Sequence, residues 1–186
     1  MNYVAQFERK ERIKKILSVI IYFAIIFALV FVISFFFVQK NVVLGDSMNP
    51  LLENGDEVLV DKLAYKIFKP KRGDVIVFKF KYLEDTYYVK RIIGLPGETV
   101  QIKGGKIYIN DELYDESYGL TDYIEDPGMA MSPITLKDDE YFVLGDNRGV
   151  SVDSRNRMVL AVKKSDIVGK VFLRIYPTKN IKIIKR

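Results

Sequence analysis

Three short segments of this 186-residue chain combine residue types that could carry out catalysis. The first is the stretch GDSMNP at residues 45–50, in which a glycine and a proline bracket a sharp turn that would present Ser47. A serine hydroxyl at such a turn can act as a nucleophile, and a backbone N–H beside it can stabilise an oxyanion. The same stretch is also typical of a surface turn without chemistry.

The second segment, TYYVKRIIGLPG at residues 86–97, predicts a strand that carries two adjacent basic residues. Lys90 and Arg91 would point to opposite faces, so one of them must lie against apolar neighbours. If Lys90 is the buried one, desolvation lowers its pKa toward neutrality and makes it a usable general base, which Arg91 cannot become. The alternative is a strand-edge lysine whose ammonium group reaches water.

The third segment, LGDNRGVSVDSR at residues 144–155, begins as a strand and continues as a loop rich in hydrogen-bond donors and acceptors. A calcium loop is excluded, because Arg148 stands where the second oxygen ligand would be. The pattern favours ion pairs that hold the loop rigid, with Asp146 and Asp153 as the acids. Their partners are to be found among Arg148, Arg155 and Arg91.

The composition restricts the chemistry further, because the chain contains no histidine and no cysteine. This excludes disulfides, thiolate nucleophiles, Cys/His zinc sites and every histidine-dependent triad. A serine nucleophile would therefore need a lysine base, and no cofactor is expected. The net charge of +5 is concentrated in residues 1–15, with five basic and two acidic side chains, so a nucleic-acid partner is not indicated.

A membrane anchor is predicted at residues 16–38, twenty-three residues without a charge, where about 20 suffice to cross a bilayer. A buried core helix and a cleaved signal peptide are the alternatives, but the bulky residues before Gln39 do not suit a cleavage site. Five basic residues precede the span and only Lys40 follows it closely, which predicts a cytoplasmic tail at residues 1–15 and an extracytoplasmic remainder.

The remainder predicts a mainly β fold. Short runs rich in Val, Ile, Tyr and Phe alternate with Gly, Pro, Asn and Asp, and Gly104-Gly105 between two alternating runs is typical of a hairpin. The pattern decays between Tyr114 and Leu136. We therefore predict a β catalytic core at residues 39–96 and 139–186, with a small β cap inserted at 97–138.

Together, the three segments resemble the conserved boxes of type I signal peptidases, specifically the small single-anchor form of Gram-positive bacteria. GDSMNPLL resembles the nucleophile box, YYVKRIIGLPGE the lysine box and GDNRGVSVDSR the third box. GDEVLVDK and RGDVIVF resemble the strands between them. The boxes occur in the family's order after one anchor, and the resemblance covers about residues 8–177.

The resemblance implies a membrane-bound serine endopeptidase with an antiparallel β core. Ser47 would attack the scissile carbonyl of a secretory preprotein, neutral Lys90 would take its proton, and Ser151 would orient Lys90. The bilayer and the preprotein would be the partners. The signal peptide would bind as an added strand, with small residues at the first and third positions before the cut.

The family likeness also implies supporting roles in the same site: Asp153 paired with Arg155, Asp146 paired with Arg91, and Met48 packed under the nucleophile turn.

Two positions depart from the family pattern. Gly45 stands where some members carry a hydroxyl-bearing residue that assists the oxyanion, and NRMVL at residues 156–160 replaces a glycine-containing turn.

Two other functions remain open at this stage. One is a membrane-anchored β module, or an inactive relative, that binds a partner without catalysis. The other is a Ser-Lys protease that cleaves itself or a repressor, although such proteins need no membrane span.

Overall fold

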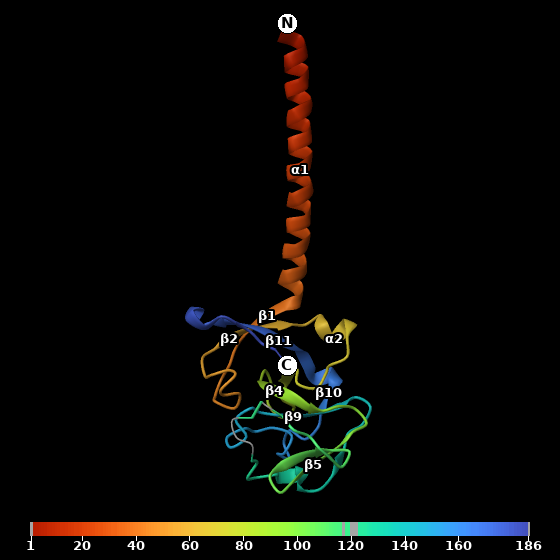
Figure 1. Ribbon diagram of the computed structural model, residues 1–186, viewed down its shortest axis with the longest axis vertical. Helices are drawn as coiled ribbons and strands as arrows, with labels where there is room; N and C mark the ends of the chain where they lie inside the picture. Colours follow the sequence, from red (N-terminus) through yellow and green to blue (C-terminus); the bar gives the residue numbers. More distant parts are fainter. Residues whose placement is uncertain (1, 117, 120–122, 186) are drawn as a thin grey trace. The chain divides into compact units, whose positions relative to one another are not determined.

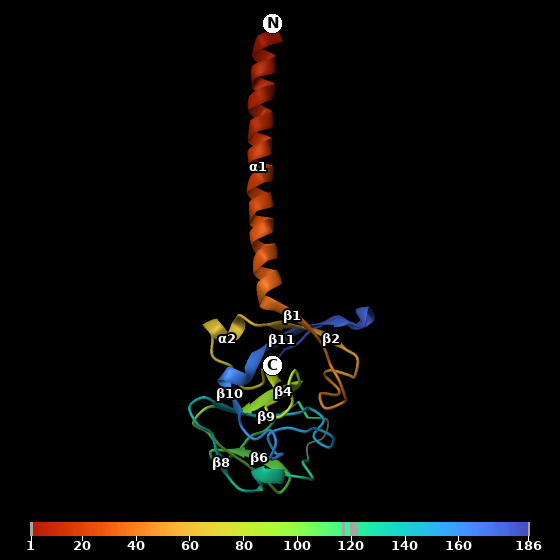
Figure 2. The ribbon, with the colours of Figure 1, turned by 180° about the vertical axis from the view of Figure 1, so that it is seen from behind.

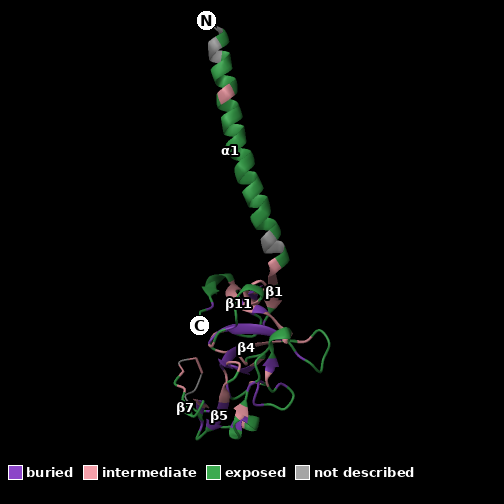
Figure 3. Cartoon of the chain, turned by 90° about the vertical axis from the view of Figure 1, so that its right-hand side faces the viewer, coloured by how far each residue is buried: buried purple, intermediate pink, exposed green. Residues whose placement is uncertain are grey.

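The computed structural model describes residues 2–116, 118–119 and 123–185 (Figure 1). The chain divides into two compact units, one ending at Val38 and the other beginning at Gln39. The first unit is the single helix α1 (Asn2–Phe37). By length and composition its stretch Gln6–Val32, with a mean hydropathy of 2.7, could cross a membrane. The helix is exposed along most of its length (Figure 3), and apolar residues on all its sides suit a lipid environment.

The helix ends one residue before the predicted end of the anchor, because Val38 already opens strand β1 (Val38–Val42). It also continues through the basic segment before the apolar run. Glu, Lys, Arg and Gln are good helix formers, and the Glu11–Lys14 pair, three residues apart, adds a 2.9 Å ion pair there.

The second unit is built on an eight-stranded sheet, which confirms the predicted mainly β fold. Its strand order is β1-β2-β11-β3-β4-β9-β10, with β12 paired to β11, and the pairings among β2, β3, β4 and β9–β12 are antiparallel. The other strands of this sheet are β2 (Glu57–Asp61), β3 (Val75–Lys79), β4 (Tyr87–Gly94), β9 (Glu140–Leu144), β10 (Val162–Lys163), β11 (Ile167–Tyr176) and β12 (Lys182–Ile183).

A four-stranded antiparallel sheet with the order β7-β6-β5-β8 forms the rest of the β structure. Its strands are β5 (Thr99–Lys103), β6 (Lys106–Ile109), β7 (Glu112–Leu113) and β8 (Ile134–Thr135), all within the range predicted as a cap. Gly104 and Gly105 join β5 to β6 with φ of 59° and 73°, the left-handed conformation that glycine adopts without steric cost. Figures 1 and 2 show this sheet at the end of the second unit remote from β1 and β2.

The short helices α2 (Ala64–Ile67), η1 (Gly128–Met131), η2 (Lys164–Asp166) and η3 (Thr178–Asn180) lie in connections between strands.

Strand β3 illustrates how apolar runs fix the large sheet. Val75 and Val77 belong to a core cluster on one face, and Ile76 and Phe78 belong to a cluster on the other, so its near-continuous apolar sequence is buried on both sides. β9 likewise gives Phe142 to a third cluster, which it shares with the small sheet. The strands that bear the candidate residues are therefore held at the centre of the unit.

Candidate active site

The predicted nucleophile turn is anchored by two buried side chains. Met48 is fully buried, and Leu52 packs in the same cluster. Backbone bonds from Asn49 N to the Asp46 carbonyl, 3.1 Å, and from Leu52 N to the Met48 carbonyl, 2.9 Å, close the turn. Ser47 is thereby presented beside β4, with its own N–H making no hydrogen bond within the described part of the chain.

Lys90 and Ser47 meet in the structure although 43 residues separate them. Lys90 Nζ lies 2.7 Å from Ser47 Oγ, within hydrogen-bond distance, and donates to the Val89 carbonyl at 2.9 Å. The lysine side chain sits on β4, a strand paired on both sides with β3 and β9, and the residue is only 4% exposed. A proton on the serine hydroxyl is thus within direct reach of the amine.

Burial changes the acidity of this amine. The pKa of Lys90 is lowered from 10.5 to about 8 in total, and the main cause is desolvation, because the charged form loses its hydration on burial. The negative charges of Asp153 and Asp146 raise the pKa and offset part of this effect. A substantial fraction of Lys90 is therefore neutral at mildly alkaline pH.

The alternation argument expected one of the two adjacent basic residues to be buried, but both are. Arg91 is 2% exposed and pairs with Asp146, donating through Nε to Oδ1 at 2.8 Å and through Nη2 to Oδ2 at 2.7 Å. Arg91 Nη1 also donates to the Gly73 carbonyl at 2.9 Å, and the ring of Tyr118 covers the guanidinium group at 4.1 Å. The Arg91 guanidinium group therefore has an anionic partner, whereas the Lys90 amine is buried without one in direct contact in the part of the chain that the structure describes.

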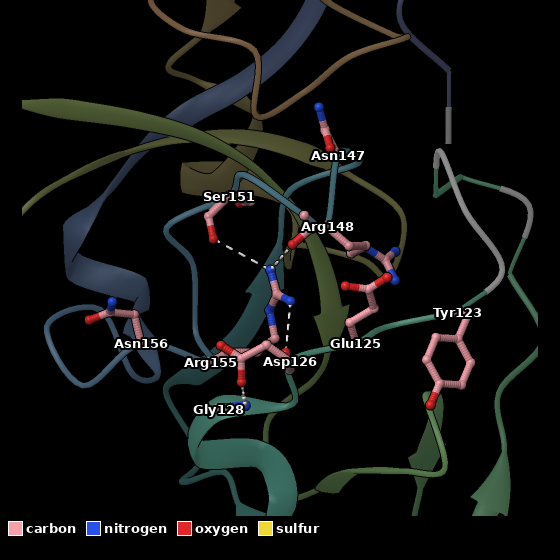
Figure 4. A pocket seen from close by; sticks show the side chains of 10 residues that line it. Tyr123, Glu125, Asp126, Gly128, Asn147, Arg148, Ser151, Arg155 and Asn156 are labelled. Atoms are coloured by element: carbon pink, nitrogen blue, oxygen red, sulfur yellow. Dashed lines mark hydrogen bonds between the residues drawn. The ribbon is translucent and has the colours of Figure 1, made fainter.

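The third segment is held by a second buried pair. Arg155 donates through Nε and Nη2 to the two carboxylate oxygens of Asp153, each at 2.9 Å. Asp153 also accepts the Gly145 N–H at 3.1 Å, and Arg155 donates to the carbonyls of Arg148 and Asp126 at 2.7 and 3.0 Å (Figure 4). The charged groups of the loop therefore bond backbone atoms as well as each other.

Ser151 does not make the predicted hydrogen bond to Lys90 in this structure. Its Oγ is buried but has no hydrogen-bond partner among the described residues, and the amine of Lys90 bonds Ser47 and Val89 instead. Ser151 nevertheless lies against the nucleophile turn. A Cβ at Gly145 would come within 2.2 Å of Ser151 Oγ and 2.4 Å of the Ser47 carbonyl oxygen, so both atoms face the same point.

This close approach gives a testable prediction for Gly145. A Gly145→Ala substitution must displace the backbone at Ser47, because that backbone oxygen cannot swing aside as a side chain would. We expect a loss of stability of about 1–3 kcal/mol and a sharp fall in any hydrolytic activity. Gly149→Ala in the same loop is the control for stability, since its nearest contact would be a side-chain atom at 3.9 Å. Equal thermal unfolding and undiminished hydrolysis in Gly145→Ala would contradict the argument.

Arg148 has a partner that the sequence argument missed. It pairs with Glu116, a residue of the range predicted as a cap, and its Nε donates to the Gly145 carbonyl at 2.9 Å. Burial raises the pKa of Glu116. Tyr118 over Arg91 comes from the same segment. Nothing in the polar, aperiodic sequence near these residues indicates such contacts, because they depend on how the cap folds back.

The atypical segment at residues 156–160 forms a compact turn of its own. Asn156 accepts the Met158 N–H on its side chain at 2.9 Å and the Val159 N–H on its carbonyl at 3.0 Å. Val159 is buried in a core cluster, and Leu160 adopts φ of 51°. The departure from the family pattern is therefore accommodated locally.

Comparisons with known proteins bear on the same region. The family described as "Signal peptidase, peptidase S26" matches residues 16–176. The chain is 40% identical over 152 residues to Signal peptidase I S of Bacillus subtilis, covering 76% of this chain and 78% of that protein. It is 35% identical over 188 residues to Signal peptidase IB of Staphylococcus aureus, covering 94% of each. A crystal structure of a signal peptidase I from Enterococcus faecalis V583 aligns with a TM-score of 0.46 and 33% identity, covering 55% of this chain and 97% of that one.

Proposed function

The chain belongs to the signal peptidase family, peptidase S26, and from that membership we propose that it is a membrane-bound serine endopeptidase with a Ser-Lys dyad. It cleaves N-terminal signal peptides from secretory preproteins after small residues. The observation that carries the proposal is the 2.7 Å approach of Lys90 Nζ to Ser47 Oγ, with the amine buried and its pKa lowered to about 8.

The proposed reaction begins when Ser47 Oγ attacks the scissile carbonyl carbon while neutral Lys90 takes the hydroxyl proton. The oxyanion that forms accepts a hydrogen bond from the Ser47 N–H. The intermediate then collapses to the acyl-enzyme as the Lys90 ammonium group donates its proton to the leaving amine. Neutral Lys90 then takes a proton from water, which attacks the acyl-enzyme ester. Cleavage of the ester bond releases the signal peptide, and the Lys90 ammonium group returns its proton to Ser47 Oγ, which restores the hydroxyl and the neutral amine.

Supporting residues hold this geometry in the proposal. The Arg91–Asp146 pair joins β4 to the third segment, and the Arg155–Asp153 pair holds the third segment itself. Met48 supports the nucleophile turn. Orientation of Lys90 by Ser151 stays a proposal for the enzyme with substrate bound, because the buried Oγ has no partner in the described residues.

The register of β4 favours an added substrate strand. β9 pairs with β4 only from Arg91 to Gly94, whereas β3 pairs from Tyr87 to Arg91. The β9 side of β4 is therefore open over Tyr87–Val89, directly beside the dyad. An extended peptide can pair with this edge and bring its scissile carbonyl to Ser47.

The direct test uses the detergent-solubilised full chain and a secretory preprotein, with the cut located by mass spectrometry. We expect one cut after a small residue, and a preprotein with Phe in place of Ala at the first position before the cut should not be processed. Ser47→Ala is the control for contaminating peptidases. Binding of the preprotein without turnover would favour the non-catalytic β module instead.

Membrane orientation is a separate prediction. We propose that residues 1–15 form a cytoplasmic tail, that residues 16–38 anchor the chain, and that the β core with its cap lies outside, since the basic residues gather before the span. A protease added to intact protoplasts should degrade the β domain. Protection of the β domain until the cells are lysed would reverse the proposed orientation.

A further inference from the structure

A cavity of about 440 Å³ lies between the third segment and the cap. Its lining includes Asn147 and Ser151 from the third segment and Glu125 and Asp126 from the cap (Figure 4). We call it the cap cavity. The proposed mechanism gives it no role.

The cap cavity begins beside the nucleophile turn. Ser151 lines it and faces the same point as the Ser47 carbonyl, as the close contacts around Gly145 require. Asn147, another lining residue, donates its backbone N–H to that Ser47 carbonyl at 3.0 Å. A peptide bound at Ser47 is therefore next to the entrance of the cavity.

The sheet register limits how far a substrate can pair with β4, and in the proposed function the signal peptide, before the cut, is the half that pairs. A peptide added along Tyr87–Val89 occupies the position that β9 takes farther along the same edge of β4. From Arg91 onward β9 itself occupies this edge, because its Leu144 pairs with Arg91. An extended substrate cannot continue as a strand past the dyad and must leave the sheet there. The half that does not pair with β4 is then directed along the third segment, toward the cap cavity.

The charges around the cavity favour a cationic peptide. Arg148 is paired with Glu116 and Arg155 with Asp153. Glu125 and Asp126 are exposed and have no ion pair within the described ranges, although Figure 4 shows Glu125 turned toward Arg148. Two acids, Glu125 and Asp126, and two arginines, Arg148 and Arg155, line the cavity. Because the charge of each arginine is offset by its buried partner, Glu116 or Asp153, the two exposed carboxylates leave the site with a negative balance.

We propose that the cap cavity binds the first residues after the cut, at the start of the released chain, and prefers basic over acidic side chains there. This inference rests on the proposed function, because it needs a peptide that is cleaved at Ser47. It adds a specificity element on the far side of the cut from the small residues that the family likeness implies.

The test compares three synthetic peptides with the detergent-solubilised full chain. All carry Ala at the first and third positions before the cut and Ala directly after it, and they differ by Lys, Gln or Glu at the second and third positions after it. We expect kcat/KM to fall in the order Lys, Gln, Glu, with about a five-fold difference between the extremes, the upper range for an exposed ion pair. About 1 M salt should bring the ratio close to one.

Two variants separate the cavity from the general charge of the protein. Glu125→Lys should abolish or invert the preference, whereas Glu112→Lys, which changes the net charge equally on exposed strand β7, should keep it. Equal cleavage of the three peptides by the unmodified chain, or a preference that Glu125→Lys leaves intact, would overturn the inference while the proposed function stands. Failure to cleave all three peptides and a preprotein would overturn both.

Discussion

Replacing Lys90 by arginine should abolish peptide cleavage as completely as replacing it by alanine. Arginine keeps the positive charge but cannot lose its proton under these conditions, so Ser47 would have no base. We expect kcat/KM to fall at least about a thousand-fold in Lys90→Arg, Lys90→Ala and Ser47→Ala. The measurement is the rate of preprotein cleavage, with circular dichroism to show that each variant retains its β structure.

The two residues should also act as one unit. In the proposed mechanism the proton moves directly between Ser47 Oγ and Lys90 Nζ, which lie 2.7 Å apart, so the double mutant should be little worse than either single mutant. Lys90→Met is the matched control for folding, because it keeps most of the buried volume without the amine. Substantial cleavage by a folded Lys90→Arg variant would rule out Lys90 as the general base.

Loss of Asp146 should have the largest effect on stability. Asp146→Ala leaves Arg91 charged, 2% exposed and without its bidentate partner, which costs about 3–5 kcal/mol. For a unit of this size the melting temperature should fall by about 10 °C or more. Thermal unfolding of the detergent-solubilised chain, followed by circular dichroism in the β region, measures this shift.

A partly exposed ion pair provides the matched control. Glu57 binds Lys40 at 3.1 Å, with side chains 30% and 55% exposed, and Glu57→Ala should change stability by less than about 1 kcal/mol. A folded Asp146→Asn variant offers a second measurement, since the Asp146 charge raises the pKa of Lys90 and its removal should shift the rise of activity to lower pH. Equal stability of Asp146→Ala and Glu57→Ala would contradict the role of the buried pair.

Much of this arrangement could be predicted from residue types and their order. The strands follow from apolar runs such as VIVFK in β3, whose side chains fill clusters on both faces. The turn at Ser47 and the hairpin at Gly104-Gly105 follow from local backbone preferences. The density of charges in the third segment indicates that Asp146 and Asp153 form ion pairs. It does not indicate which of the three candidate arginines binds which acid.

What the sequence could not predict depends on contacts between distant segments. Strand alternation distinguishes the two faces of β4 but not how well each is covered, so it did not indicate that Arg91 is buried as deeply as Lys90. Glu116 lies in a stretch without periodicity, and its pairing with Arg148 joins two segments that are distant in the sequence. Ser151 and the Ser47 carbonyl both lie against Gly145, where there is no side chain to separate them. The spacing of these residues in the sequence does not predict that proximity.

The most direct test of the dyad is the pH dependence of kcat/KM for the unmodified chain. Only the neutral amine can take the Ser47 proton, and burial lowers the pKa of Lys90 from 10.5 to about 8. Activity should therefore rise with pH through a single ionisation near 8 and level off above it, because kcat/KM reports the free enzyme. A rate that stays constant from pH 6 to 10, or that rises only near the ordinary pKa of lysine, would contradict the account.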